Sequence, residues 1–517
     1  MSKGRVEKSL RNSTLSLTAQ IVSVALSFVV RTIFIKHLGN SYLGIDGLFT
    51  NILSLLSFAE LGFGTAIVYA MYKPLADNDE KQISAFMNFY AKIYRSIGGF
   101  ILIGGACLIP FLDFFIGDKS QIPADLPPLY IVYMLYILNT AAGYFFNYKR
   151  SIVLASQNGY IDSLNQLAFN TLRNILQIFV LIIFHSFILY LLIQIVCTFL
   201  GNIFISLKAD KLFPFLKLGK REKLDNLTIR SILKNVSAMT FHKLGSVVVG
   251  GTDSILITKF VSLVATGQYS NYVLLTSTVK NVYLQILSPL TASVGNLIAT
   301  ESKEKSYAFF KRILFMNSYI AIFCTVCLTY LSNPFIELFW GKDSMFSMSL
   351  VLLIMTNFYI NSIRKTAQMF IDTTGLFWQI RWKSLVEAII NLGASIFFAS
   401  TLNMGITGIV LGTIVSNVTT NVWWEPYVVY KFFFEKPLYL YFVDYSKNLI
   451  CLILSFIVSY KLIMLTGSGI SGFALKCIIS ALIPNIVIFL LFSRTDEYKY
   501  FVNLLTNVIR KRVIKSN

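Results

Sequence analysis

Charged side chains inside long apolar runs are the residues of this sequence that could do chemistry. Glu60 stands in the run "LLSFAELGFGTAIVY", residues 55–69. A carboxylate at such a position is costly in lipid unless it is paired or takes up a proton. The other charges that we select on the same ground are Arg31, Arg173, Lys243, Asp253 and Lys280. Each is a candidate for contact with a substrate or for an ion pair within the protein.

Amide side chains accompany these charges at steps of three or four residues, which place them on one face of a helix. These polar stripes contain Gln166, Asn170 and Gln177 around Arg173, then Asn281 and Gln285 beside Lys280, and finally Asn357 and Asn361. Lipid cannot satisfy such groups, so the stripes must face protein or water. We expect a wet cavity, and the alternative is hydrogen bonding between packed helices.

The elements that position these residues are apolar helices. The chain has 517 residues, of which 55% are hydrophobic and 14% charged, whereas soluble domains carry about 25% charged residues. Apolar runs long enough to span a bilayer recur along the chain, without the alternation of a membrane β-barrel. The sequence therefore predicts an all-α polytopic membrane protein with fourteen spans: 12–35, 43–72, 83–111, 127–148, 160–184, 187–207, 236–259, 266–298, 307–331, 346–372, 377–400, 405–430, 446–464 and 473–493.

The net charge of +20 is concentrated in alternate connections. Basic residues crowd at 3–11, 208–234 and 494–515, whereas the connections near 113–126 and 332–344 are nearly free of them. This distribution follows the positive-inside rule and places both termini in the cytoplasm. It also explains the basic composition without a nucleic-acid partner. We expect no removable signal peptide.

The chain contains an internal repeat. The segment "IKHLGNSYLG" (35–44) is similar to "TKFVSLVATG" (258–267), so Gly44 matches Gly267 at an offset of 223 residues. Two six-helix lobes with the same orientation would be related by a pseudo-two-fold axis along the membrane normal. The predicted organisation is an N-lobe at 1–207, a basic cytoplasmic linker at 208–235, a C-lobe at 236–432, two additional spans within 433–493 and a basic cytoplasmic tail at 494–517.

The same offset predicts which charges share a depth. It relates Lys280 to position 57, one helical turn from Glu60, and Asp253 to position 30, next to Arg31. We therefore expect two layers of charge in a central cavity, with Glu60 facing Lys280. The alternative is a set of static ion pairs within one lobe.

The stretch "RTIFIKHLGNSYLGIDGLFTNILSLLSFAELGFGTAIVYAMYKPLADND", residues 31–79, resembles the first hairpin of Wzx-type polysaccharide flippases. These belong to the multidrug/oligosaccharidyl-lipid/polysaccharide (MOP) exporter superfamily. The chain length, the repeat and the two additional spans are also similar to that family. The resemblance implies a two-lobed, MATE-like bundle in the bacterial cytoplasmic membrane. It implies alternating access that moves undecaprenyl-diphosphate-linked oligosaccharide units outward for capsule, exopolysaccharide or O-antigen biosynthesis.

In such flippases, cations in the first helices of each lobe would meet the diphosphate, which here implies Arg31, Lys243 and Lys280. Glu60 would offset Lys280 in the resting state or carry a coupling proton. The expected partners are the lipid-linked glycan, membrane lipids and the polysaccharide polymerase machinery. We expect no metal site and no cofactor, and the coupling ion, H⁺ or Na⁺, is left open.

Three other function classes make different demands on these residues. A multidrug exporter of the same fold would require an anionic cavity, whereas the cations selected above outnumber the anions. A flippase of another lipid-linked cell-wall precursor would fit these residues as well. An enzyme of the same pathway would require a catalytic cluster in an outer loop, and neither 113–126 nor 332–344 contains a histidine. We therefore predict no catalytic residues. A scaffold that uses the linker 208–235 would leave the polar stripes without a purpose.

Overall fold

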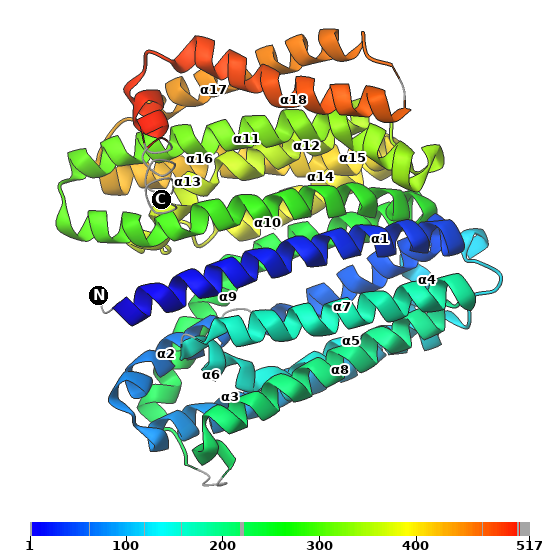
Figure 1. Cartoon of the computed structure of the whole chain (residues 1–517), viewed down its shortest axis with the longest axis vertical. Helices are drawn as coiled ribbons and strands as arrows, with labels where there is room; N and C mark the ends of the chain where they lie inside the picture. The colour runs from blue at the N-terminus through cyan, green and yellow to red at the C-terminus, as the bar shows by residue number, and fades with distance from the viewer. Residues whose placement is uncertain are drawn as a thin grey trace, which may run out of the picture. The chain divides into compact units, whose positions relative to one another are not determined.

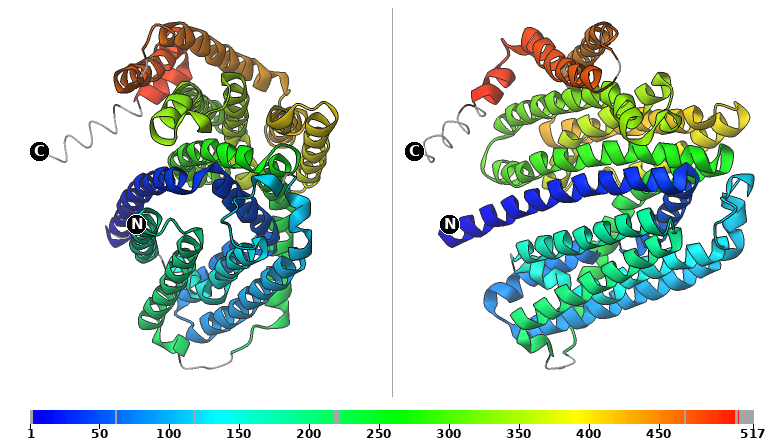
Figure 2. Two further views of the ribbon diagram at one scale, coloured as in Figure 1. Left: turned by 90° about the vertical axis from the view of Figure 1, so that its right-hand side faces the viewer. Right: turned by 45° about the vertical axis from the view of Figure 1, so that its right-hand side comes forward.

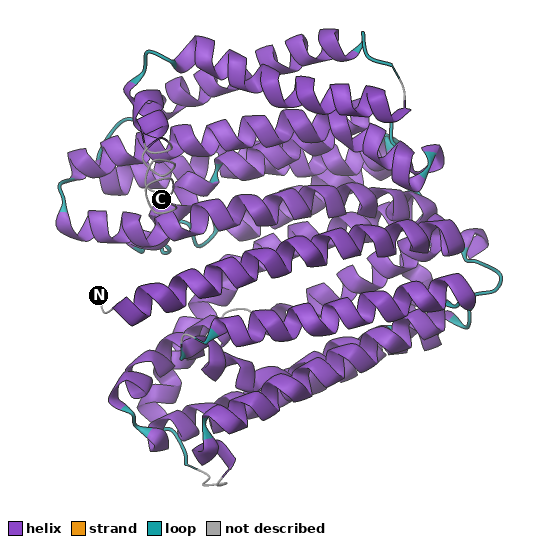
Figure 3. Ribbon diagram, in the orientation of Figure 1, coloured by secondary structure: helices purple, strands orange, loops and turns teal. Residues whose placement is uncertain are grey.

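All regular structure in the described part of this chain is helical. The computed structural model describes residues 3–60, 63–117, 119–156, 158–217, 222–467, 469–503 and 506, and these residues form no strand (Figure 3). The chain divides into two compact units, Met1–Gly267 (unit 1) and Gln268–Asn517 (unit 2). The predicted all-α fold class is therefore confirmed.

Unit 1 is a helical bundle in which each long helix packs against its neighbour in space, in an order that differs from the order along the chain. Helix α3 contacts α5, α5 contacts α8, and α8 contacts α7, which lies against α1 (Figure 1). Helix α9 also contacts α1. The helices of this unit are α1 (Lys3–Leu56), α2 (Phe63–Asp77), α3 (Glu80–Cys107), α4 (Leu112–Phe115), α5 (Leu129–Phe146), α6 (Arg150–Ala155), α7 (Gly159–Ile183), α8 (Phe187–Leu212) and α9 (Asn226–Phe260).

Unit 2 begins within α10 (Leu263–Thr300), and its last two helices pack against each other and onto α11 (Figure 2). A large aromatic and aliphatic core joins α11 to its neighbours in this unit. The remaining helices are α11 (Lys303–Trp340), α12 (Met348–Ile363), α13 (Lys365–Thr374), α14 (Lys383–Ile396), α15 (Gly405–Ser416), α16 (Val422–Val429), α17 (Tyr439–Ile463) and α18 (Gly469–Phe492).

The chain is a multi-pass membrane protein. Among the described residues, eight helices are long and apolar enough to cross a membrane, and ten if two bent helix pairs each count as one span. This number is below the predicted fourteen partly because one helix, Val22–Leu56, runs from the first predicted span into the second, and because α12 has only 16 residues. The count of fourteen and the lobe boundaries at 1–207 and 236–432 stay predictions. In the structure α9, which was assigned to the C-lobe, lies in unit 1.

Gly39 interrupts α1 where the sequence predicts the first connection between spans. Its φ of 84° and ψ of 179° are not helical, although helix continues on both sides. A positive φ of this size strains any residue with a Cβ, so glycine is the residue that permits the break. The first predicted connection is therefore a glycine kink within α1.

The two glycines that the repeat relates contact each other's neighbours in unit 1. A Cβ on Gly44 would lie 2.0 Å from the carbonyl oxygen of Leu263, and a Cβ on Gly267 would lie 2.1 Å from that of Asn40. Asn40 and Leu263 are separated by the same 223 residues as the glycines, so the contact is reciprocal. Small residues of this kind let two backbones approach closely in a membrane.

We predict that Gly44→Ala lowers the free energy of unfolding by about 1–3 kcal/mol, because overpacking against backbone forces the two segments apart. Gly143→Ala is the matched control, since a Cβ there meets no atom within 4 Å; it should be neutral or stabilise α5 by up to about 1 kcal/mol. Reversible unfolding of the purified protein in mixed detergents measures both. Equal effects of the two substitutions would contradict the close contact.

Candidate functional site

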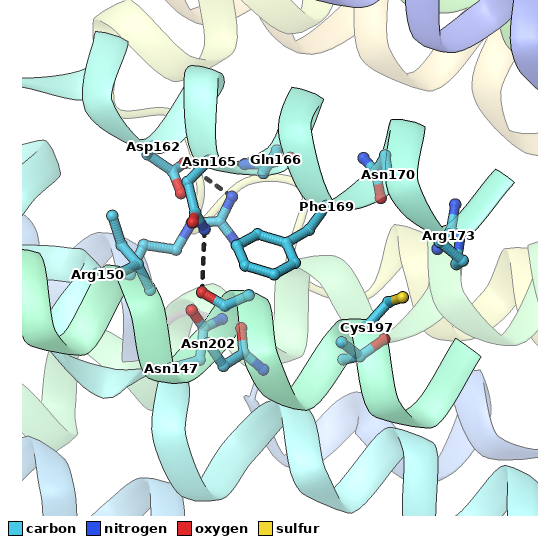
Figure 4. Close-up of a pocket in the computed structure, with 13 residues that line it drawn as sticks. Asn147, Arg150, Asp162, Asn165, Gln166, Phe169, Asn170, Arg173, Cys197 and Asn202 are labelled. Carbon is cyan, nitrogen blue, oxygen red and sulfur yellow. Dashed lines mark hydrogen bonds and ion pairs between the residues drawn. The ribbon is translucent and has the colours of Figure 1, made fainter. Parts of the chain in front are cut away.

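A polar pocket lies between α7 and α8 in unit 1 (Figure 4). Its volume is about 190 Å³, and it is bounded by two helices that are long and apolar enough to span a membrane. Most of its polar lining consists of amides, with two arginines, one aspartate and one aromatic ring. These residues are Asn147, Arg150, Asp162, Asn165, Gln166, Phe169, Asn170, Arg173 and Asn202.

An ion pair between Arg150 and Asp162 lies at one end of this pocket. The guanidinium of Arg150 lies 2.7 Å from a carboxylate oxygen of Asp162, and the amide of Gln166 donates to the same oxygen at 2.8 Å. Asp162 is buried, 5% exposed, so its charge needs this compensation. The pair is neutral as a whole.

The predicted stripe on α7 is divided between the pocket and the helix packing. Gln166, Asn170 and Arg173 line the pocket, as the expected exposure of a polar face to a cavity requires. Gln177 is buried instead, and its amide donates to the carbonyl of Tyr190 on α8 at 3.3 Å. The role of these residues in substrate binding stays a prediction.

Two tyrosines hold Glu60, which lies in the short 3₁₀ turn Ser57–Glu60 after α1. The hydroxyl of Tyr94 on α3 donates to Oε1 at 2.5 Å, and that of Tyr144 on α5 donates to Oε2 at 2.7 Å. Hydroxyl donors stabilise a carboxylate more strongly than they stabilise a neutral acceptor. Glu60 is therefore positioned by unit 1 itself. Its predicted pairing with Lys280, which lies in unit 2, stays a prediction.

Another acidic residue, Asp46 on α1, lies near Arg31. Asp46 is within electrostatic reach of the Arg31 guanidinium, and its Oδ1 accepts a hydrogen bond from Tyr136 on α5 at 2.5 Å. Asp253, the predicted companion of Arg31, is buried on α9 at 7% exposure. The side chain of Lys243, also on α9, lies outside the described residues.

Unit 2 contains a buried network of four charges. Arg364, between α12 and α13, binds Glu425 of α16 through two nitrogens at 2.5 and 2.9 Å. Lys383 of α14 lies 2.9 Å from Glu425 and 3.2 Å from Glu387. The four side chains are between 1% and 8% exposed. Two cations and two anions make the network neutral, which is a requirement for charge at this depth.

Amides of the predicted stripe extend this network. Asn361 accepts from Arg364 at 3.3 Å, and Asn357 accepts from Asn361 and from Asn417 at 3.0 and 2.8 Å. Asn421 donates to Glu387 and to Asn417, at 2.6 Å in both cases. In unit 2, Asn357 and Asn361 are thus hydrogen-bonded to one another and to α15–α16, which is the alternative to a wet cavity that the sequence left open.

A π-helical turn at residues 417–421, between α15 and α16, brings Asn417 and Glu425 onto the same face of the helix. In a regular α-helix, eight residues rotate a side chain by about 80° beyond full turns. A π turn takes in roughly one residue more than an α turn. Asn417 and Glu425, eight residues apart, are therefore returned to the same face, where both reach Arg364.

The predicted residues of α10 are not part of this hydrogen-bonded network. Lys280, Asn281 and Gln285 are exposed, and among the described residues none of them is hydrogen-bonded to the network, although Lys280 lies within electrostatic reach of the Arg364 guanidinium. They share one face of α10, as their spacing predicts. Whether they contact a substrate stays a prediction.

Sequence reasoning missed Asp46, Lys383 and Glu425. Lys383 lies within the predicted span 377–400 but is not among the selected charges; in the structure it begins α14 and is 3% exposed. Asp46 and Glu425 are single acids within apolar stretches, "YLGIDGLF" and "TNVWWEPYVV". The criterion that selected Glu60, a charge inside a span, would have found both.

This chain is similar to known proteins in structure, but the sequence comparisons found no match. No protein-family model and no curated protein matches the sequence. A structure of the lipid II flippase MurJ in an inward closed conformation matches with a TM-score of 0.63 and 15% identity, covering 93% of this chain and 99% of that one. An inward-facing MATE multidrug transporter of the MOP superfamily matches with a TM-score of 0.62 and 13% identity, covering 80% of this chain and 98% of that one.

A Vibrio cholerae MATE transporter matches with a TM-score of 0.58 and 15% identity, covering 83% of this chain and all of that one. These identities are low, so the likeness concerns the fold. The chain has the fold of MurJ and the MATE transporters, as the resemblance had implied.

We predict that Glu425→Gln lowers the free energy of unfolding by about 3–5 kcal/mol, because it leaves two buried cations facing one anion. Glu301→Gln is the control: its pair with Lys305 lies at the surface and contributes at most about 1 kcal/mol. Reversible unfolding in mixed detergents compares the two variants. Similar losses would mean that the buried network does not stabilise unit 2.

Proposed function

We propose that this chain is a flippase of the MOP exporter superfamily. Its substrate would be an oligosaccharide linked to undecaprenyl diphosphate, and it would move this lipid from the cytoplasmic to the outer leaflet of the bacterial cytoplasmic membrane by alternating access. The product would serve the biosynthesis of a cell-surface polysaccharide. Both termini would lie in the cytoplasm, as the charge distribution favours.

The observation that carries this proposal is the extent of the structural likeness. The MurJ structure covers 93% of this chain, whereas the MATE structures cover 80% and 83%. The difference is about as long as the two helices α17 and α18 together, which pack onto α11. A fold alone does not fix a substrate, but a likeness to a lipid flippase over more of the chain favours a lipid-linked substrate.

The polar residues within the membrane spans are of the kind that such a substrate requires. Amides hydrogen-bond to sugar hydroxyls as both donors and acceptors, and unit 1 gathers five of them in the pocket between α7 and α8. Lysine is a common partner of phosphate groups, and Lys280 is exposed on α10. Both features support a glycan joined to a diphosphate.

A multidrug exporter is the second candidate, because the MATE transporters have nearly the same TM-score as MurJ. An exporter of organic cations requires available anionic groups. The carboxylates of Asp162, Glu387 and Glu425 are already paired with arginine or lysine, which favours the flippase. A flippase of another lipid-linked cell-wall precursor would use the same features.

We expect wild-type protein in proteoliposomes to flip a fluorescent oligosaccharide attached to a polyprenyl diphosphate. Lys280→Ala and Arg31→Ala should each lower the flipping rate about tenfold or more, the effect of losing one charged hydrogen bond. Lys305→Ala, which removes an exposed lysine, is the control and should match the wild type.

Two outcomes of this assay would contradict the proposal. If the wild type moves organic cations and no lipid-linked glycan, the protein is an exporter. If Lys280→Ala and Arg31→Ala both flip the glycan at the wild-type rate while remaining folded, these cations are structural and do not meet the diphosphate.

Glu60→Gln separates the two roles proposed for Glu60. The hydroxyls of Tyr94 and Tyr144 both donate hydrogen bonds to the Glu60 carboxylate, and we expect it to act as a counter-charge. The variant should then flip more slowly than wild type by a similar factor at every pH, measured across the range in which the protein is stable. A wild-type pH dependence that disappears in Glu60→Gln would instead identify Glu60 as the proton carrier.

A further inference from the structure

We infer that the pocket between α7 and α8 binds one acidic sugar of the transported glycan, with Arg173 holding the acid and the pocket amides holding the ring hydroxyls. This inference rests on the proposed function and names the part of the substrate that the pocket would recognise.

The size of the pocket fits a single sugar ring. Its 190 Å³ is the volume of about six liquid water molecules and is smaller than the roughly 300–1,000 Å³ of pockets that enclose drug-sized ligands. The step from Asp162 to Arg173 corresponds to about 16 Å of helix. The pocket is therefore a local recess beside one helix face, too small for an oligosaccharide or a polyprenyl chain.

Two amide oxygens in the pocket call for a hydroxyl donor. The side-chain oxygens of Asn147 and Asn165 are buried and have no hydrogen-bond partner among the described residues. The other half of the Asn165 amide is fixed, since it donates to the carbonyl of Gly201 at 3.0 Å. A buried acceptor without a donor is costly, and a sugar hydroxyl can supply the donor. Phe169 adds an aromatic face to the same wall (Figure 4).

The charge of the pocket selects a monoanion. Arg150 and Asp162 neutralise each other, and Arg173 makes no hydrogen bond or ion pair with the rest of the described chain. One net positive charge remains, on a guanidinium whose planar donors match a carboxylate in a two-pronged geometry. A diphosphate carries more charge than one arginine offsets, so a sugar carboxylate fits the pocket better than the lipid diphosphate does.

Transport of two matched substrates tests the inference. One lipid-linked oligosaccharide carries a uronic acid, and the other carries the same sugar with its carboxyl reduced to an alcohol. Wild type should flip the acidic glycan faster, and Arg173→Gln should lower that rate about tenfold with little effect on the neutral glycan. Arg230→Gln, at an exposed arginine on α9, is the control and should keep the wild-type preference.

A direct binding measurement keeps the inference separate from the transport activity. Saturation-transfer NMR on the full chain in nanodiscs, with methyl glucuronide, methyl glucoside and inorganic pyrophosphate as probes, should detect the glucuronide with wild type and lose it with Arg173→Gln. Asn165→Leu should weaken the glucuronide signal as well.

The outcomes are distinguishable. If wild type flips neither glycan but glucuronide binding depends on Arg173, the proposed flippase function fails and the pocket assignment stands. If wild type flips both glycans equally and Arg173→Gln does the same, the pocket assignment fails and the flippase function stands. If pyrophosphate binds through Arg173 and glucuronide does not, the acidic-sugar assignment is overturned.

Discussion

The inability of hydrocarbon to hydrogen-bond is the constraint on which this structure depends. Every charge or amide that the sequence places within a span must find a partner in the protein or a polar recess. The two units meet this requirement differently. Unit 2 joins Arg364, Lys383, Glu387 and Glu425 into a neutral, buried group. Unit 1 pairs part of its polar face and leaves the remainder, around Arg173, lining a pocket.

The paired charges of unit 2 favour a rigid structure, whereas the polar pocket of unit 1 favours recognition of a ligand. A saturated network between α12, α14 and α16 resists rearrangement, because moving any member exposes an unpaired charge at depth. Arg173, which lines the pocket and makes no hydrogen bond or ion pair with the described part of the chain, instead keeps its planar donors available to a ligand. Glu60 lies between these cases. Tyrosines from α3 and α5 hold its carboxylate, yet tyrosine hydroxyls can rotate to other acceptors as an ion pair cannot.

The sequence predicted the features that depend on local chemistry. The helical class, an interruption near Gly39 and the polar face of α7 all follow from composition and periodicity. The partners of that chemistry were not predictable. Periodicity tells which face of a helix is polar, but not that Glu425, 61 residues from Arg364, would meet it. The likeness to MurJ, at 15% identity, is likewise visible only once the helices are assembled.

The π turn at Asn417–Asn421 gives chain length a meaning of its own in unit 2. In a regular helix that lacked one residue between Asn417 and Glu425, these two residues would stand seven apart, a rotation of about 700° that is about 20° short of two full turns. Glu425 would then keep its face toward Arg364 without a π turn. A regular helix of the present length would instead rotate Glu425 by about 80° away from Asn417, although no polar residue had been replaced. The π turn therefore compensates for one additional residue, and a related sequence could lack that residue and still align the network.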